Sequence, residues 1–286
     1  MKKRMLAGVL ALVMIFGLLP VAAMAADETV ARIGTTDYTS LDAAVEDAAN
    51  GDTITLLKDA PLTFSKIENK SLTFTGNGTI TVKDQTRDGY QGDLKFDGKG
   101  LAFEWIGSEN GYWLQLAMSG SLTFSNGAAG IFSFDSAEGT NCAIYMSENK
   151  SMRINVENGS SLSIYGKNTK GVPGQGIQLG KTANTHIRVT GGSTFLIDGT
   201  NRGYVNSPEV YVEDSEFTVQ NCTSKASNGG KFTAIKSDIT FLNNNGHGLS
   251  TNALTIEDST VEANGNTLYG TTVNQSPVLI DSRSTV

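Results

Sequence analysis

The sequence predicts an all-β solenoid, in which short strands stack coil upon coil. The first observation is a fixed repeat in the last third of the chain. Four serines recur every 22 residues and each opens a short strand: Ser193, Ser215, Ser237 and Ser259. A fixed period of this size is typical of stacked repeat structures. The next serine along the chain is Ser282, at an interval of 23, so we expect the repeat to continue there with a small slip.

The second observation is alternation within each of these strands. Apolar side chains stand two and four residues after each serine: Phe195, Phe217, Ile239, Val261, Ile197, Val219, Phe241 and Ala263. The positions between them are mostly polar. Successive side chains of a strand point to opposite faces, so we expect one face of each strand to lie in the core and the other in solvent.

The third observation is a second strand before each serine. Its apolar pairs keep the same relative positions in three coils: Val210 and Val212, Phe232 and Ala234, Leu254 and Ile256. In the preceding coil Ile187 and Val189 are displaced by one residue, which predicts a bulge at Gly191 and Gly192 and an outward-facing Arg188. Dividing the residues after Asp52 by the period gives about ten coils of two or more strands.

Residues 1–25 have the pattern of a secretory signal peptide. A basic start is followed by an apolar stretch from Ala7 to Leu19 and a small-x-small cleavage site at Ala23 to Ala25. A retained membrane anchor is the alternative, which Pro20 and the cleavage site disfavour. We therefore expect the mature chain to begin near Ala26 and to contain no membrane span.

Residues 26–51 predict a strand and a capping helix. Thr39 or Ser40 can cap the helix, and Asn50 with Gly51 can end it. Its apolar stripe contains Leu41, Ala44, Val45 and Ala48. We expect this helix to cover the open end of the strand stack in residues 52–286, because an uncovered first coil would present unpaired backbone groups.

Charge and cysteine content narrow the class of partner. The chain has 29 acidic and 22 basic residues, a balance that disfavours nucleic acid or anionic lipid as a partner. Its two cysteines, Cys142 and Cys222, would lie several coils apart in a stack, which is too far for a disulfide. The prediction is therefore two buried free thiols.

The stacked coils resemble the right-handed parallel β-helix of the pectin-lyase-like fold, with Asn221 and Asn243 expected as an asparagine ladder at one corner. The stretch from Ile33 to Val45 resembles the β-helix entry of many exported surface proteins of Gram-positive bacteria. The resemblance implies one right-handed solenoid of about 22 residues per coil and a secreted or cell-surface location. This fold hosts lyases, hydrolases, adhesins and structural spacers.

Catalytic motifs are incomplete. Gly246, His247 and Gly248 resemble the Gly-His-Gly motif of polygalacturonases, but the aspartates and the Arg-x-Lys motif of that family do not match here. His247 is the first candidate if the protein is an enzyme; otherwise this motif is a loop corner. Lys236 stands between Asp214 and Asp258 in one column, as in a cross-strand charge ladder, and would neutralise a calcium site. We therefore expect no metal and no other cofactor.

A binding site needs fewer precisely placed side chains than a catalytic site. Tyr90, Trp105, Tyr112 and Trp113 could present flat rings to sugars, or the apolar rings could simply pack an irregular coil. Three arginines are expected on solvated faces: Arg153, Arg188 and Arg202. The leading hypothesis is a non-catalytic surface module, adhesin-like, that binds a polysaccharide or a surface glycoprotein. A polysaccharide lyase or glycoside hydrolase and a structural spacer are the alternatives.

The last coil, which begins at Pro277, has no polar cap in the sequence. We expect either that the chain is the amino-terminal part of a longer surface protein or that a second copy covers this coil.

Overall fold

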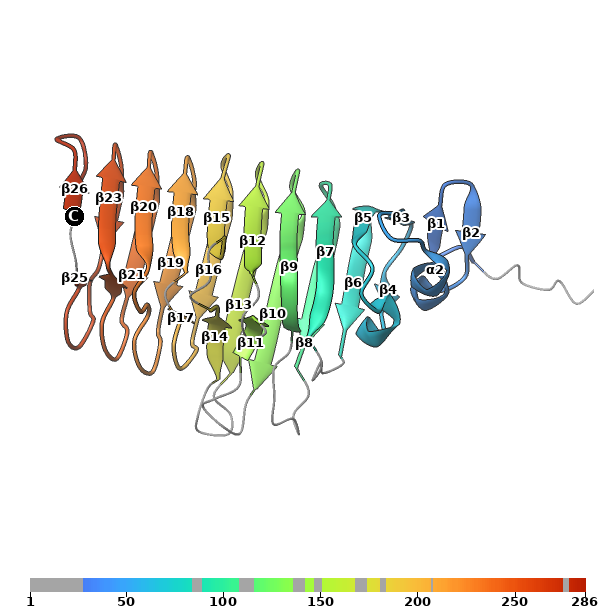
Figure 1. Cartoon of the computed structure of the whole chain (residues 1–286), viewed down its shortest axis with the longest axis horizontal. Helices are drawn as coiled ribbons and strands as arrows, with labels where there is room; N and C mark the ends of the chain where they lie inside the picture. Colours follow the sequence, from blue (N-terminus) through green and yellow to red (C-terminus); the bar gives the residue numbers. More distant parts are fainter. Residues whose placement is uncertain are drawn as a thin grey trace, which may run out of the picture.

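A computed structural model describes residues 28–83, 89–107, 116–135, 142–146, 151–167, 174–180, 184–206, 208–274 and 278–286. These residues form a parallel β-solenoid of about 8 turns with ~24 residues per turn. The coils follow one another from α2 at one end to β26 at the other (Figure 1). The predicted all-β solenoid is therefore confirmed.

Two long sheets run along the stack. Sheet A is 15-stranded, and its main path is β2 (Thr36–Tyr38), β1 (Ala31–Ile33), β3 (Thr53–Leu56), β5 (Leu72–Gly76), β7 (Tyr90–Asp97), β9 (Leu116–Ser125), β12 (Met152–Glu157), β15 (His186–Thr190), β18 (Glu209–Glu213), β20 (Lys231–Ile235), β23 (Ala253–Glu257) and β26 (Val278–Ile280). The same sheet also includes β11 (Cys142–Met146), β14 (Gln175–Gln178) and β17 (Tyr204–Val205).

Sheet B is 9-stranded and runs through β4 (Ala60–Pro61), β6 (Gly78–Val82), β8 (Leu101–Ile106), β10 (Ala129–Asp135), β13 (Ser161–Lys167), β16 (Thr194–Asp198), β19 (Glu216–Gln220), β21 (Asp238–Leu242) and β24 (Thr260–Glu262). A third, short sheet pairs β22 (Leu249–Thr251) with β25 (Thr271–Val273). Strands of successive coils pair in parallel, while β1 pairs antiparallel with both β2 and β3.

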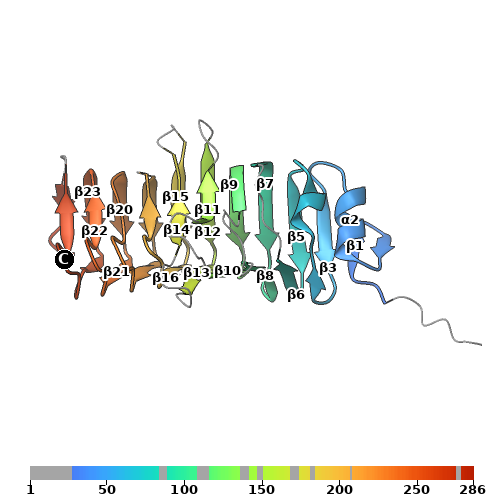
Figure 2. The ribbon, with the colours of Figure 1, turned by 90° about the horizontal axis from the view of Figure 1, so that it is seen from below.

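The N-terminal end of the stack is covered by α2 (Leu41–Asp47) and by the 3-10 helix η1 (Phe64–Ile67). Ser40 caps α2, since the backbone N–H of Ala43 donates to its Oγ at 3.2 Å. Leu41, Ala44, Val45 and Ala48 are all buried, as their spacing predicts. Figures 1 and 2 both place α2 beside β1 and β3, at the end of the stack. The predicted capping helix is confirmed.

The coil length varies along the chain. The interval between stacked residues is 22 from Ser193 to Ser215, but 28 from Asp93 to Ser121 and 33 from Gly127 to Ser160. The middle coils are therefore longer than the repeat in the last third of the sequence. For this reason the structure has about 8 turns, where a constant period predicts about ten.

The interior is built from stacked apolar columns. The predicted inward-facing residues of sheets A and B are buried, with Ala263 partly buried against them. Aromatic rings in neighbouring coils lie nearly parallel: Phe195 and Phe217 have centroids 4.8 Å apart with 3° between the ring planes. Phe96 stacks in the same way between Phe74 and Phe124. Each coil thus covers the apolar surface of the next.

The repeated serines form a hydrogen-bonded ladder at the corner between sheets A and B. The backbone N–H of each serine donates to the Oγ of the serine one coil further on, at 3.0 to 3.3 Å: Ser160 to Ser193, Ser193 to Ser215, Ser215 to Ser237, Ser237 to Ser259, and Ser259 to Ser284. The expectation that Ser282 continues the series is wrong by two residues. The turn around Asp281 takes up the extra residues before Ser284.

An asparagine ladder lies at the far end of sheet B, but one residue later than predicted. Asn221 and Asn243 occupy the left-handed corner, with φ of 55° and 54°. The buried ladder residue is Asn244, whose Oδ1 accepts from the backbone N–H of Cys222 at 2.9 Å. Asn266 repeats this contact one coil on, accepting from the backbone N–H of Asn244 at 3.1 Å.

The extra residue after β15 is accommodated as predicted. Gly191 and Gly192 both adopt left-handed backbone conformations, with φ of 69° and 73°. Ile187 and Val189 consequently remain in the core, opposite Val210 and Val212, while Arg188 is exposed.

The two cysteines are buried free thiols, which confirms the prediction. Burial raises the pKa of Cys142 to about 12. The pKa of Cys222 also rises to about 12, mainly because of burial.

Exposed large apolar side chains gather at the C-terminal end of the stack: Leu268 and Tyr269 in the coil before the last, and Val278, Leu279, Ile280 and Val286 in the last coil. Val278 and Ile280 continue the inward-facing columns of Leu254 and Ile256. Coverage of the last coil by a second copy stays a prediction.

Over the described ranges no helix has the length and apolar character needed to cross a bilayer, and the predicted signal peptide, residues 1–25, lies outside them.

Candidate functional site

The predicted aromatic platform is not present where the structure describes it. Tyr90 is 4% exposed and its hydroxyl donates to the backbone oxygen of Lys70. Trp105 is 0% exposed, with its ring 4.7 Å from that of Phe64. Both rings pack the interior because their strand positions face inward. Tyr112 and Trp113 lie outside the described residues, so their part in binding stays a prediction.

His247 lies at a corner between coils. Its backbone oxygen accepts from the N–H of Ala226 at 2.9 Å, and its ring stacks on Tyr269 with centroids 5.3 Å apart. Nδ1 is buried and has no hydrogen-bond partner among the described residues. Nor do those residues contain a group of three His, Cys, Asp or Glu side chains able to hold a metal ion.

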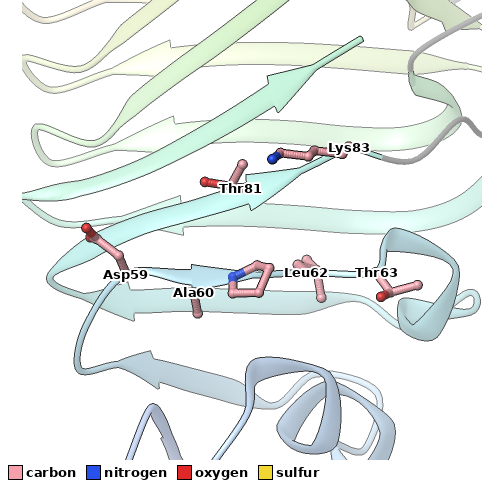
Figure 3. Close-up of a pocket in the computed structure, with 7 residues that line it drawn as sticks. Asp59, Ala60, Leu62, Thr63, Thr81 and Lys83 are labelled. Carbon is pink, nitrogen blue, oxygen red and sulfur yellow. The ribbon is translucent and has the colours of Figure 1, made fainter. Parts of the chain in front are cut away.

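A hollow of about 390 Å³ lies beside the short edge strand β4 (Figure 3). Asp59 and Lys83 contribute its charged groups, on neighbouring segments of the stack. The carboxylate of Asp59 accepts from the backbone N–H of Thr79 at 2.7 Å, so it closes the local turn. The other described lining residues are small or apolar, and the described lining contains no pair of carboxylates for acid–base chemistry.

A second hollow, of about 220 Å³, lies at the corner between sheets A and B. Asp214, Lys236 and Asp238 line it together with the ladder residue Ser215, whose Oγ already accepts from the Ser193 N–H and donates to the backbone oxygen of Glu213. Over the part of the chain that is described, Lys236 forms no ion pair with Asp214 or Asp258. The predicted charge ladder is therefore not a contact ladder. Asp214, Lys236 and Asp258 instead share a left-handed backbone conformation at this corner, with φ of 49° to 50°.

The outer face of sheet A carries a third group of polar side chains, on three neighbouring strands. Asn155 on β12, Arg188 on β15 and Tyr211 on β18 are paired in register, so their side chains lie in one row across the coils. His186, two residues before Arg188, projects from the same face. We call Asn155, His186, Arg188 and Tyr211 the Arg188 patch.

The patch is held by its own contacts. The guanidinium carbon of Arg188 lies 5.0 Å from the centroid of the Tyr211 ring, within the range of a cation–π contact. The hydroxyl of Tyr211 donates to Glu213 at 3.1 Å. On the other side, Asn155 Nδ2 donates to Thr123 Oγ1 at 3.1 Å, which directs its Oδ1 to His186 Nε2 at 3.2 Å. With the Asn155 amide in this orientation, Nε2 of a neutral His186 is the donor to Oδ1, which makes Nδ1 the acceptor nitrogen of the ring.

The charges around the patch are paired unequally. Arg153 forms an ion pair with Asp93 at 3.3 Å, and Lys231 forms one with Glu209 at 3.5 Å. Arg188 has no ion pair with any carboxylate in the described ranges, although it is exposed. A cation–π contact uses none of the guanidinium N–H groups as hydrogen-bond donors to a carboxylate, so they stay available to another acceptor. Arg188 is therefore a cation of this face whose N–H donors have spare hydrogen-bonding capacity.

The electrostatics of the patch appear in two pKa shifts. Partial burial lowers the pKa of His186, and the neighbouring Arg153 and Arg188 lower it further, against the opposing effect of Glu209. Burial also raises the pKa of Tyr211, with its hydrogen bond to Glu213 acting in the same direction. Neutral imidazole and neutral phenol are thus the forms favoured near neutral pH.

Sequence reasoning placed Arg153 and Arg188 on a solvated face and missed the Tyr211 contact. The signal was present in the repeat, because Arg188 and Tyr211 occupy the same outward position in consecutive coils.

Comparisons with known proteins do not assign this chain to a relative. No protein-family model matches it, and no similar protein was found among curated proteins or solved structures.

Proposed function

We propose that this protein is a non-catalytic, exported surface module that binds a glycan or a surface glycoprotein through the outer face of sheet A. The observation that carries the proposal is the exposed Arg188, whose guanidinium carbon lies over the Tyr211 ring at 5.0 Å from its centroid. An aromatic ring beside free hydrogen-bond donors is a common arrangement in sugar-binding surfaces, since the ring covers the apolar face of the sugar and the donors reach its oxygens.

The scaffold supports this role. The patch residues stand on strands locked in register by their neighbours on both sides. Side chains on such a face keep their spacing without the ordering cost that a flexible loop pays on binding. A row of similar coils also offers an extended surface, which suits a chain-like ligand.

Catalysis is the alternative, as a polysaccharide lyase or glycoside hydrolase of the pectin-lyase-like fold. His247 is stacked on Tyr269 at a corner, and the two hollows do not bring it together with their carboxylates. The arrangement therefore favours binding over bond cleavage. A structural spacer is the remaining alternative and would bind no glycan.

The test uses the mature chain, residues 26–286, in affinity electrophoresis through gels that contain neutral or acidic polysaccharides, with and without Ca²⁺. The same mixtures are assayed for new reducing ends and unsaturated products. The proposal predicts retardation without products. Products that disappear in His247→Ala would overturn it in favour of an enzyme, and the absence of both retardation and products would favour a spacer.

Export has a separate test. The N-terminal sequence of the protein recovered from the medium or the cell surface of a Gram-positive host should begin near Ala26. Recovery of uncleaved protein in the membrane fraction would contradict the signal-peptide prediction.

A further inference from the structure

We infer that the Arg188 patch binds the anionic group of an acidic glycan, a carboxylate or a sulfate, with Arg188 as the principal contact. This inference rests on the proposed binding function and specifies the chemical class of its ligand. It follows from the balance of charges on the outer face of sheet A.

The guanidinium of Arg188 is available to a ligand. The exposed cations on either side of Arg188 along this face are each within 4 Å of a carboxylate: Arg153 with Asp93 and Lys231 with Glu209. Arg188 contacts the ring of Tyr211 instead. A planar guanidinium presents two parallel N–H donors, which match the two oxygens of a carboxylate or sulfate.

Hydrogen bonds fix the polar side chains beside Arg188. Asn155 stands beside Arg188 in register and is fixed by Thr123 and His186. The phenol of Tyr211 is fixed by Glu213. Among the described residues the patch thus combines a cation that has no ion pair with polar groups beside it, which can bind the charge and the hydroxyls of an anionic sugar.

The net charge of the protein makes the binding of an acidic glycan selective for a local contact. The chain carries a formal net charge of −7, so a polyanion is repelled by the protein as a whole. Retention of an acidic glycan would therefore depend on a local contact. Since Arg188 is exposed, we expect that contact to weaken as added salt screens it.

Acidic pH adds a second cation to the patch. The groups that face His186 are Arg153 and Asn155 on β12, Arg188 on its own strand and Glu209 on β18. Because Asn155 holds Nε2 as a donor, protonation occurs at Nδ1. A bound anion would favour this protonation, so anion binding should strengthen as the pH falls towards the pKa of His186.

The experiment compares three polymers with one backbone: dextran, carboxymethyl-dextran and dextran sulfate. The mature chain is tested for retention on each at low ionic strength, and the two anionic forms separate a carboxylate from a sulfate preference. We expect retention on at least one anionic form and none on neutral dextran. Arg188→Gln should weaken the dissociation constant by about tenfold or more, the usual effect of losing a charge-assisted hydrogen bond.

Arg32→Gln is the matched control. Arg32 is an exposed arginine on β1, remote from the Arg188 patch, and its replacement changes the net charge by the same amount. It should bind like the wild type. Arg188→Lys should keep part of the affinity, since lysine retains the charge without the planar pair of donors. His186→Gln should remove the strengthening at acidic pH. Thermal unfolding of each variant checks that the fold is kept.

Three results would overturn the inference. These are equal retention on neutral dextran, retention of anionic polymer that Arg188→Gln leaves unchanged, and retention on neither anionic polymer. None of these three results by itself disproves the proposed binding function, which is tested on the wider polysaccharide panel. Binding to neutral glycans there, without anion binding, would leave the module intact and remove only the inference.

Discussion

The backbone N–H of Ser215 donates to the Oγ of Ser237 at 3.3 Å, across 22 residues of sequence. The Ser237 hydroxyl in turn donates to the backbone oxygen of Ile235 at 2.7 Å. A single side chain therefore satisfies two backbone groups at a corner where the sheet ladder is interrupted. Serine suits this position because its hydroxyl is short and can both donate and accept.

Ser237→Ala should consequently lower the free energy of unfolding by about 1–3 kcal/mol, since it leaves the Ser215 N–H buried without an acceptor. Urea unfolding at neutral pH measures the change. Thr240→Ala, on the outer face of β21 in the same coil, is the control and should change stability by at most about 0.5 kcal/mol. Equal losses in the two variants would show that the ladder has no special role.

Asn244 should contribute more to stability than Ser237, because Asn244 is 0% exposed and its amide has three hydrogen-bond partners. Oδ1 accepts from the Cys222 N–H, and Nδ2 donates to the backbone oxygen of Val219 and to Asn266 Oδ1. We expect Asn244→Ala to cost about 3 kcal/mol or more, since several buried polar groups lose partners together.

The control for Asn244 is Asn264→Ala, because the Asn264 side chain is exposed and bonds only to Glu262 among the described residues. Urea unfolding measures the free energy of unfolding of both variants. A loss at Asn244 no larger than that at Asn264 would contradict the buried-ladder account.

The two thiols should be inert in the folded protein. Burial raises the pKa of Cys142 and of Cys222 to about 12, so the reactive thiolate is scarce at pH 8. A colorimetric thiol reagent should detect no fast-reacting thiol in the native chain and two after unfolding in guanidinium chloride. Rapid native labelling, or fewer than two thiols after unfolding, would disagree with the structure.

His186 should make stability depend on pH in one direction. Its pKa in the folded protein is lower than the ordinary 6.5, so the unfolded chain takes up the proton first as the pH falls. Stability is then lost from about pH 7 downward, through the unfolded pKa and towards the folded one.

His186→Gln removes that titration. The difference in unfolding free energy between wild type and variant should therefore shift in favour of the variant from pH 7.5 to pH 5. A difference that stays constant across this range, or that shifts towards the wild type, would refute the direction of the pKa change.

The last third of the chain was the most predictable part of the fold. There the coils keep nearly constant length, so Phe217 and Val219 could be placed in the core from their distance to Ser215 alone. The middle coils were less predictable, since intervals of 28 to 33 residues remove the fixed period. Ser160 belongs to the same ladder as Ser193, but no constant spacing connects it to the later serines.

The candidate site was harder to predict than the fold. Trp105 and Tyr90 are aromatic, but their alternation places them inward, and burial removes them as a surface platform. Tyr211 could not be singled out from the sequence, because its role depends on its contact with Arg188 in the neighbouring coil. The order of side chains across coils depends on register, and one residue of slip at Gly191 and Gly192 decides whether Arg188 faces solvent or core.

The most direct test of the central claim compares two tyrosines on opposite sheets. Tyr211 lies on the outer face of sheet A, and Tyr165, which is 38% exposed, lies on the outer face of sheet B. Tyr211→Ala and Tyr165→Ala are measured by affinity electrophoresis on a polysaccharide that retards the wild type. The account predicts that Tyr211→Ala loses retardation and Tyr165→Ala keeps it. Retardation kept by Tyr211→Ala and lost by Tyr165→Ala would place binding on sheet B and contradict the account.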